Sequence, residues 1–155
     1  QLCPFCRTPA AETDEEIVRR NMKRVDVGDA KALYELGGYY SEGQFNMPQD
    51  RDKALELYHQ TGELGIAASY YNIGIAYDSG RGVERDEKKA THYYELAAMG
   101  GDEYARHNLG NAAARAGNYG RALRHYMIAV ESGYHGSLKM IQQMCTLGHA
   151  TRDDY

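Results

Sequence analysis

The sequence of 155 residues is long enough for one domain with a modest core, and it contains 14 tyrosines but no tryptophan. Its formal charge of −4 leaves no positive surplus for neutralising a phosphate backbone, which argues against a nucleic-acid partner. The longest apolar stretches, such as residues 127–130, are far shorter than the roughly 20 residues that a membrane-spanning helix needs. These properties predict a protein that neither binds nucleic acid nor enters a membrane.

The cysteines fall into a close pair, Cys3 and Cys6, and a distant third residue, Cys145. This distribution does not build the disulfide framework of a small secreted scaffold, so we expect an intracellular, cytoplasmic location. The first residue is Gln1 rather than Met, and we expect the sequence to have been cut from a longer one. Residues 1–12 are assigned to the cysteine segment and a linker.

A helix is predicted directly after this segment. Thr13 and Glu16 have the spacing of a capping box, and apolar residues then follow at helical spacing. The helix should run from about Asp14 to Val25. Residues 13–27 are therefore expected to form an N-terminal capping element.

Three repeat units follow in register. The glycines that mark the unit boundaries are separated by 37, 36 and 32 residues, so the third unit has lost part of a loop. The predicted boundaries are 28–64, 65–100 and 101–132, with a partial unit at 133–148 and a truncated tail at 149–155. The columns that return in each unit begin with Ala32, Leu36, Gly37 and Tyr40, then Ser69, Ile73, Gly74 and Tyr77, then Ala105, Leu109, Gly110 and Ala113.

Two further columns predict where the second helix of each unit begins and ends. One column supplies a side-chain oxygen for the free N–H groups of a first helical turn, and it contains Asp50, Asp86 and Asn118. The other places glycine where a helix ends in a left-handed conformation, and it contains Gly65, Gly101 and Gly133. Each unit is therefore a pair of helices.

A third column places glycine inside the first helix of each unit, where it costs about 1 kcal/mol relative to alanine. We expect close packing of the two helices to compensate for this cost, with small residues of the second helix as the partner surface. The glycine column contains Gly37, Gly74 and Gly110, and the column of small partner residues contains Ala54, Ala90 and Ala122. One helix pair cannot bury its apolar face alone, so successive pairs must stack. The predicted fold is all-α, an α-solenoid of stacked antiparallel helix pairs.

The pattern A-x-x-x-L-G-x-x-Y-x-x-G, followed by D-x-x-K-A-x-x-x-Y-x-x-A-A-x-x-G, resembles the Sel-1-like repeat, a relative of the tetratricopeptide repeat. Unit two matches best because it includes Ala97 and Ala98, whereas unit one has Thr61 and Gly62 near those positions. Unit three lacks the Gly-Val loop. Members of this family are adaptors and scaffolds, so the resemblance implies protein binding and brings no catalytic residues.

The segment Cys3-Pro4-Phe5-Cys6-Arg7 resembles the final knuckle of a RING-type zinc finger. The resemblance implies that Cys3 and Cys6 are zinc ligands in a complete RING, that Pro4 faces a ubiquitin-conjugating enzyme, and that Arg7 helps to hold charged ubiquitin. Two thiolates cannot fill a tetrahedral zinc site, so we expect no cofactor in this chain alone and zinc only in the full-length protein. Alternatively, the CxxC is an incidental pair, a redox dithiol or part of another zinc module.

A binding groove is predicted by analogy with tetratricopeptide repeats, in which positions just before the interior glycine point into the concave face. Aromatic rings and side-chain amides at such positions suit a protein or peptide ligand. An ordinary polar surface is the alternative reading. The candidate residues are Tyr34, Glu35, Gly38, Tyr71, Asn72, Ile75, His107, Asn108 and Asn111.

The sequence thus predicts a partner-binding scaffold that is not itself an enzyme and that serves as the recruiting part of a longer RING-type ubiquitin ligase. The alternative is a plain Sel-1-like scaffold or cochaperone-type adaptor without a ubiquitin role. A hydrolase or metalloenzyme is disfavoured, because none of the six histidines forms an HExxH motif or recurs beside a carboxylate in a repeat column.

Overall fold

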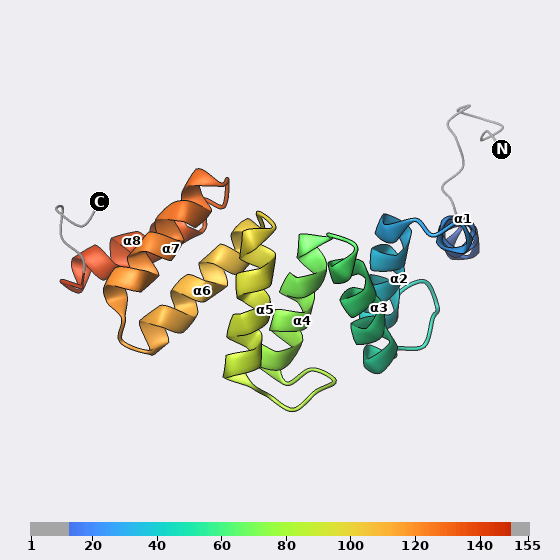
Figure 1. The fold of residues 1–155 in the computed structure, drawn as a ribbon, viewed down its shortest axis with the longest axis horizontal. Helices are drawn as coiled ribbons and strands as arrows, with labels where there is room; N and C mark the ends of the chain where they lie inside the picture. Colours follow the sequence, from blue (N-terminus) through green and yellow to red (C-terminus); the bar gives the residue numbers. More distant parts are fainter. Residues whose placement is uncertain (1–12, 150–155) are drawn as a thin grey trace, which may run out of the picture. The chain divides into compact units, whose positions relative to one another are not determined.

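The computed structural model describes residues 13–149, which form eight α-helices and no strand (Figure 1). This confirms the predicted all-α class. The predicted zinc-finger residues Cys3, Pro4, Cys6 and Arg7 lie outside the described range. The helices are α1 (Asp14–Asp26), α2 (Ala30–Glu42), α3 (Arg51–Glu63), α4 (Ala67–Ser79), α5 (Glu87–Met99), α6 (Glu103–Arg115), α7 (Tyr119–Glu131) and α8 (Ser137–Thr146).

The chain divides into two compact parts within α3, an N-terminal part that ends at Leu57 and a C-terminal part that begins at Tyr58. In the N-terminal part, α1 packs against α2. The predicted capping box is present, since the Thr13 hydroxyl accepts from the backbone N–H of Glu16 and the Glu16 carboxylate accepts from that of Thr13. The predicted helix is thus present, with its end at Asp26.

In the C-terminal part, each first helix packs against its own second helix, α4 against α5 and α6 against α7. Each pair also packs against the next helix along the chain, α5 against α6 and α7 against α8 (Figure 1). The core of these contacts combines alanines with two almost fully buried tyrosines, Tyr94 and Tyr126. The stacked helix pairs expected of a solenoid are therefore present in this part.

The predicted helix boundaries are confirmed by their caps. Side-chain oxygens of Asp50, Asp86 and Asn118 accept hydrogen bonds from backbone N–H groups in the first turns of α3, α5 and α7. The three boundary glycines have positive φ angles, as the left-handed conformation requires. Two further caps were not predicted from the sequence, Asp29 before α2 and Asp102 before α6.

Two interior glycines, Gly74 and Gly110, make room for tyrosine rings, a contact that adds to the predicted alanine surface. A methyl group added at Gly74 would lie 2.5 Å from the ring of Tyr94, and one at Gly110 would lie 2.5 Å from the ring of Tyr126. The alanines of the second helices are buried as expected, but the ring of the neighbouring tyrosine column occupies the space beside the glycine. The glycine and the tyrosine therefore form one packing unit.

The divergent end of unit one is matched by changes at the start of unit two. The hydroxyls of Thr61 and Ser69 are both buried and lie 2.6 Å apart, within hydrogen-bonding distance. Gly62 lies against the ring of Tyr70, since an added methyl group would come within 2.6 Å of it. One repeat further along, the corresponding positions hold Ala97, Ala98, Ala105 and Arg106, which need neither a hydroxyl pair nor a glycine.

Candidate partner-binding face

Aromatic rings connect the first helices of successive repeats in the C-terminal part. Tyr71 of α4 lies 5.8 Å from Tyr104 of α6, and Tyr104 lies 4.9 Å from Tyr134, just before α8, measured between ring centroids. Tyr104 is 47% exposed, whereas the other two are half-buried. We call Tyr71, Tyr104 and Tyr134 the aromatic face.

A layer of amide groups lies beside the aromatic face. Asn108 forms side-chain hydrogen bonds with Tyr71 and Tyr94. Asn111 accepts from the hydroxyl of Tyr126 at 2.8 Å and donates to the side-chain oxygen of Asn108 at 3.4 Å. Burial raises the pKa of all three tyrosines, which therefore keep their protons at neutral pH. The two amides hold tyrosines in place rather than standing free for a ligand.

His107 joins α6 to the start of α8. Its ring lies 5.4 Å from that of Tyr126 and 4.9 Å from that of Tyr134, and its Nδ1 is 2.8 Å from the hydroxyl of Ser137. Burial lowers the pKa of His107, so the imidazole is neutral near pH 7 and can share a hydrogen bond with Ser137 in either direction. This histidine is a structural link, and among residues 13–149 its hydrogen-bond and ring contacts are with Ser137, Tyr126 and Tyr134 rather than with a carboxylate.

Asp102 adds a carboxylate near the aromatic face. It caps α6 by accepting from the backbone N–H of Ala105 at 2.8 Å. Burial raises the pKa of Asp102, and its charge contributes to the raised pKa of Tyr71, so the two groups are neighbours. The face therefore combines aromatic surface with one acidic group.

The predicted groove residues of α4 and α6 are partly brought together. Tyr71, His107, Asn108 and Asn111 belong to the aromatic face or to the hydrogen bonds beside it, as described above. Ile75 instead packs against the core, and Asn72 is half-buried.

The predicted residues of α2, Tyr34, Glu35 and Gly38, belong to the N-terminal part and are half-buried. Glu35 accepts hydrogen bonds from Arg24 at 3.1 Å and Asn21 at 3.3 Å, both on α1. Arg24 also donates to Asp29 at 2.9 Å. The Glu35 carboxylate therefore accepts hydrogen bonds from two side chains of α1 and links α2 to that helix.

Tyr104 and Tyr134 were not predicted from the sequence. Tyr104 falls at a position where the other two units have Lys31 and Ala68, so it lies outside every core column. A tyrosine at a repeat position that is otherwise occupied by small or polar residues could have indicated an exposed aromatic side chain, and this difference was visible in the repeat pattern.

Neither a metal-binding cluster nor a membrane-spanning helix is found in the part of the chain that the structure describes. Within residues 13–149, no cluster of three or more His, Cys, Asp or Glu side chains could hold a metal ion. None of the helices in this range is long and apolar enough to cross a membrane.

Residues 30–66 and 67–102 match the Sel1 repeat family. Two consecutive segments of the chain are thus similar to the Sel1 repeat. The matched ranges begin two residues later than the predicted units 28–64 and 65–100, and the third predicted unit lies almost entirely beyond them. Sel1-repeat solenoids are non-enzymatic scaffolds that generally mediate protein–protein interaction.

Two solved structures have the same fold. The Sel1 repeat protein from Oxalobacter formigenes is 27% identical with a TM-score of 0.77, and the match covers 84% of this chain and 54% of that one. The protective antigen c5321 of uropathogenic Escherichia coli, which displays an SLR fold, is 25% identical with a TM-score of 0.79, covering 92% of this chain and 31% of that one.

Among curated proteins, the ERAD-associated E3 ubiquitin-protein ligase component HRD3B of Arabidopsis thaliana is 27% identical over 66% of this chain and 16% of its own length. The chain spans between 5% and 18% of the lengths of the curated relatives that it matches.

Proposed function

We propose that this Sel1-repeat scaffold recruits a partner protein by binding one of its peptide segments on the aromatic face. The observation that carries the proposal is the half-exposed ring of Tyr104, which is flanked on both sides by tyrosine rings from neighbouring repeats. Tyrosine offers large contact area at low entropic cost, and the hydrogen bond of Tyr71 to Asn108 fixes part of the face before a ligand arrives.

Replacing Tyr104 and Tyr134 by alanine together is expected to weaken partner capture by about 30-fold or more, which corresponds to a hot-spot loss of about 2 kcal/mol. The measurement is a quantitative pull-down from cell extract, with the double variant compared against the parent chain. Met99→Ala is the matched control, because Met99 is 74% exposed on α5 and lies outside the aromatic face. Equal capture by the double variant and the parent would show that another surface binds the partner.

Asn108→Ala is a poor probe for this purpose, although Asn108 is a predicted groove residue. Its side chain is a hydrogen-bond partner of Tyr94, which is only 2% exposed. Removing the amide would leave a buried hydroxyl without this partner and destabilise the fold, by about 1–3 kcal/mol. Reduced capture by that variant would therefore not distinguish lost binding from lost folding.

We further propose that the recruited partner is a ubiquitination substrate of a longer RING-type protein. Two observations support this: Cys3-Pro4-Phe5-Cys6-Arg7 has the pattern of the last RING knuckle, and one relative is named as an E3 ubiquitin ligase component. Cys3 and Cys6 would supply two of the four ligands that a structural zinc ion needs, so the ion would be held only in a complete RING. Pro4 would contact the ubiquitin-conjugating enzyme.

In an autoubiquitination assay with the full-length protein, Arg7→Ala is expected to slow ubiquitin transfer at least about tenfold, a barrier increase of about 1.4 kcal/mol. Partner capture through the aromatic face should be unchanged in the same variant. A full-length sequence without further Cys or His pairs before Gln1 would disprove the ligase role and leave a plain Sel1 scaffold or cochaperone-type adaptor.

A further inference from the structure

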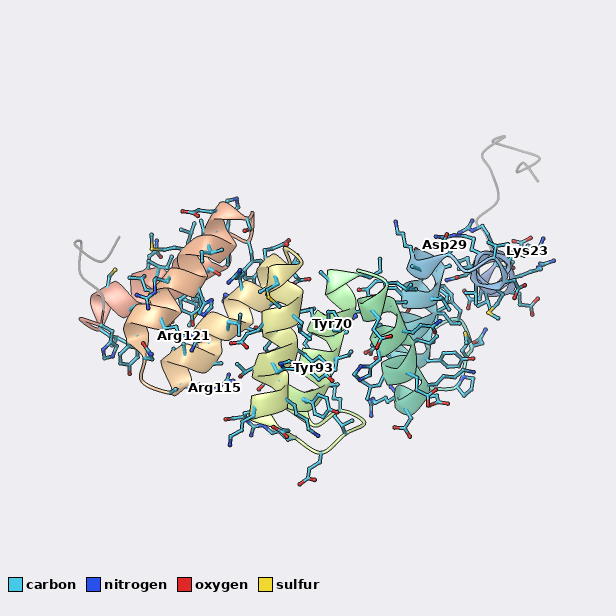
Figure 2. All side chains as sticks on the ribbon, in the orientation of Figure 1. Lys23, Asp29, Tyr70, Tyr93, Arg115 and Arg121 are labelled. Carbon is cyan, nitrogen blue, oxygen red and sulfur yellow. The ribbon has the colours of Figure 1, made fainter. Side chains whose placement is uncertain are left out.

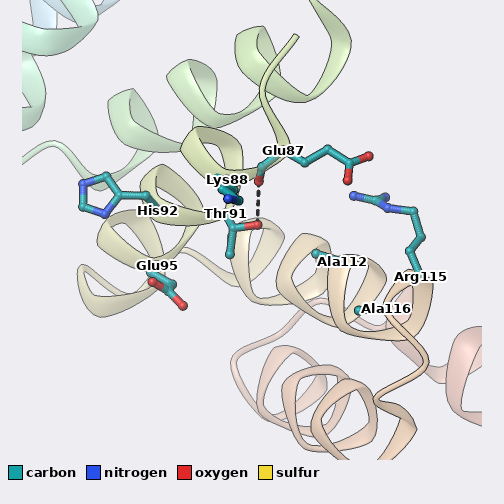
Figure 3. Close-up of a pocket in the computed structure, with 8 residues that line it drawn as sticks. All are labelled: Glu87, Lys88, Thr91, His92, Glu95, Ala112, Arg115 and Ala116. Carbon is teal, nitrogen blue, oxygen red and sulfur yellow. Dashed lines mark hydrogen bonds between the residues drawn. The ribbon is translucent and has the colours of Figure 1, made fainter.

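A second surface feature lies on the C-terminal part, between α5, the end of α6 and the start of α7. Two adjacent hollows of about 460 and 220 Å³ share three lining residues, Thr91, Ala112 and Ala116. Figure 3 shows the alanines along α6 on one side and the side chains of α5 on the other. We call these two hollows the alanine groove. None of its lining residues belongs to the aromatic face.

The shortened third repeat explains why the alanine groove is open. Residues 80–86 join α4 to α5, and this longer loop folds back on itself, with Arg85 donating to the backbone carbonyl of Asp78 at 2.9 Å. Only residues 116–118 join α6 to α7. This short turn adds no cover to the end of α6, and Ala116 remains exposed.

Two arginines stand beside the alanine floor, Arg115 at the end of α6 and Arg121 in the first turns of α7 (Figure 2). Arg115 pairs with Asp78 at 3.4 Å, and Arg121 pairs with Glu95 at 3.2 Å. Both arginine side chains are about half exposed, at 50% and 52%. Exposed ion pairs of this kind contribute little to stability, so each arginine can exchange its partner for another carboxylate at small cost.

The lining of the groove holds more cationic than anionic side chains, namely Lys88, Arg115 and Arg121 against Glu87 and Glu95. The N-termini of both α5 and α7 border it, through Glu87, Lys88 and Asn118. The partial positive charge of a helix N-terminus favours a nearby anion, typically by about 0.3–1 kcal/mol. The Glu87 carboxylate pairs with Arg85 at 2.6 Å. The carboxylate that the chain itself pairs with Arg115 is that of Asp78.

We propose that the alanine groove binds an acidic, extended segment of a partner protein. A small apolar side chain of that segment would rest on Ala112 and Ala116, where the absence of larger side chains permits close approach. Carboxylates on either side would reach Arg115 and Arg121, whose planar guanidinium groups can bind a carboxylate through two parallel hydrogen bonds. The scaffold then has two binding surfaces on the same repeats, one aromatic and one for an acidic segment.

The test uses the chain itself and a fluorescein-labelled peptide of sequence Glu-Ala-Glu-Glu-Ala-Glu, with the Gln-Ala-Gln-Gln-Ala-Gln peptide as its neutral counterpart. Fluorescence anisotropy should show saturable binding of the acidic peptide that weakens with added salt, and at least about tenfold weaker binding of the neutral one. Arg115→Gln with Arg121→Gln, and separately Ala116→Leu, should each weaken binding of the acidic peptide by about tenfold or more. Circular dichroism checks that each variant is folded.

Tyr104→Ala is the matched control, and it should bind the acidic peptide as the parent chain does. Three outcomes would overturn the proposal. The first is no saturation up to about 1 mM peptide, which corresponds to a binding free energy weaker than about 4 kcal/mol. The others are equal binding of the neutral peptide and unchanged binding by the folded double glutamine variant. The glutamine variant alters only exposed side chains, so the proposal remains testable even if Ala116→Leu disturbs the end of α6.

Discussion

Replacing Tyr126 by alanine is expected to lower the free energy of unfolding by about 3–5 kcal/mol, the cost typical of removing a buried aromatic ring. Tyr126 is fully buried, and its ring packs in the cluster that joins α6, α7 and α8. The cavity cannot close easily, because Gly110 on the opposite side of the ring has no side chain to fill it. Urea denaturation followed by circular dichroism measures the loss.

Tyr126→Phe separates the ring from its hydroxyl. This variant keeps the ring but removes the hydrogen bond that the hydroxyl donates to Asn111 at 2.8 Å. The expected loss is about 1 kcal/mol, the typical net value for one hydrogen bond. If phenylalanine were as damaging as alanine, the hydrogen bonds among Asn108, Asn111 and the tyrosines would be the main stabilising element instead of ring packing.

Gly110→Ala is expected to destabilise the chain by about 1–2 kcal/mol, although alanine is the better helix former. The new methyl group would lie 2.5 Å from the ring of Tyr126, which is buried on all sides and cannot rotate away. Overpacking of this kind costs about 1–3 kcal/mol, and the helix propensity of alanine returns up to about 1 kcal/mol. The midpoint of urea denaturation should fall accordingly.

Gly120→Ala provides the control for this prediction. Gly120 also lies in a helix, α7, but a methyl group there would meet nothing within 4 Å. This variant is expected to stabilise the chain by about 0.5–1 kcal/mol, because only the propensity term acts. A loss of stability in Gly120→Ala, or a gain in Gly110→Ala, would contradict the proposed role of the interior glycines.

The repeat pattern predicted much of this fold because its strongest signals are local. Asp86 and Asn118 cap helices through contacts with residues two or three positions away, so their spacing in the sequence was sufficient. The positive φ of Gly65 and Gly101 likewise depends on the turn that contains them. The contacts of Gly74 with Tyr94 and of Gly110 with Tyr126 were not predicted, because they depend on how two helices cross.

The binding surfaces were less predictable for a related reason. The position of Asn108 in its repeat predicted a side-chain amide available to a ligand. In the structure this amide interacts with Tyr71 and Tyr94, which come from two other helices and could not be assigned to it from the sequence. The alanine groove was missed because Ala112 and Ala116 have no chemical signal of their own. The groove arises from the short connection between α6 and α7 together with charges on α5 and α7.

The matched substitutions at Thr61, Gly62, Ser69 and Tyr70 bear on how such proteins can be recombined. Suppose that a designer replaced unit two by a copy with alanine in place of Ser69 and arginine in place of Tyr70. The Thr61 hydroxyl would then lose its partner at 2.6 Å, and the space beside Gly62 would lose the tyrosine ring that fills it. The segment that can be transplanted without loss is therefore the end of one repeat together with the start of the next. Chimeras should be joined in the middle of a helix pair, with each junction between pairs left intact.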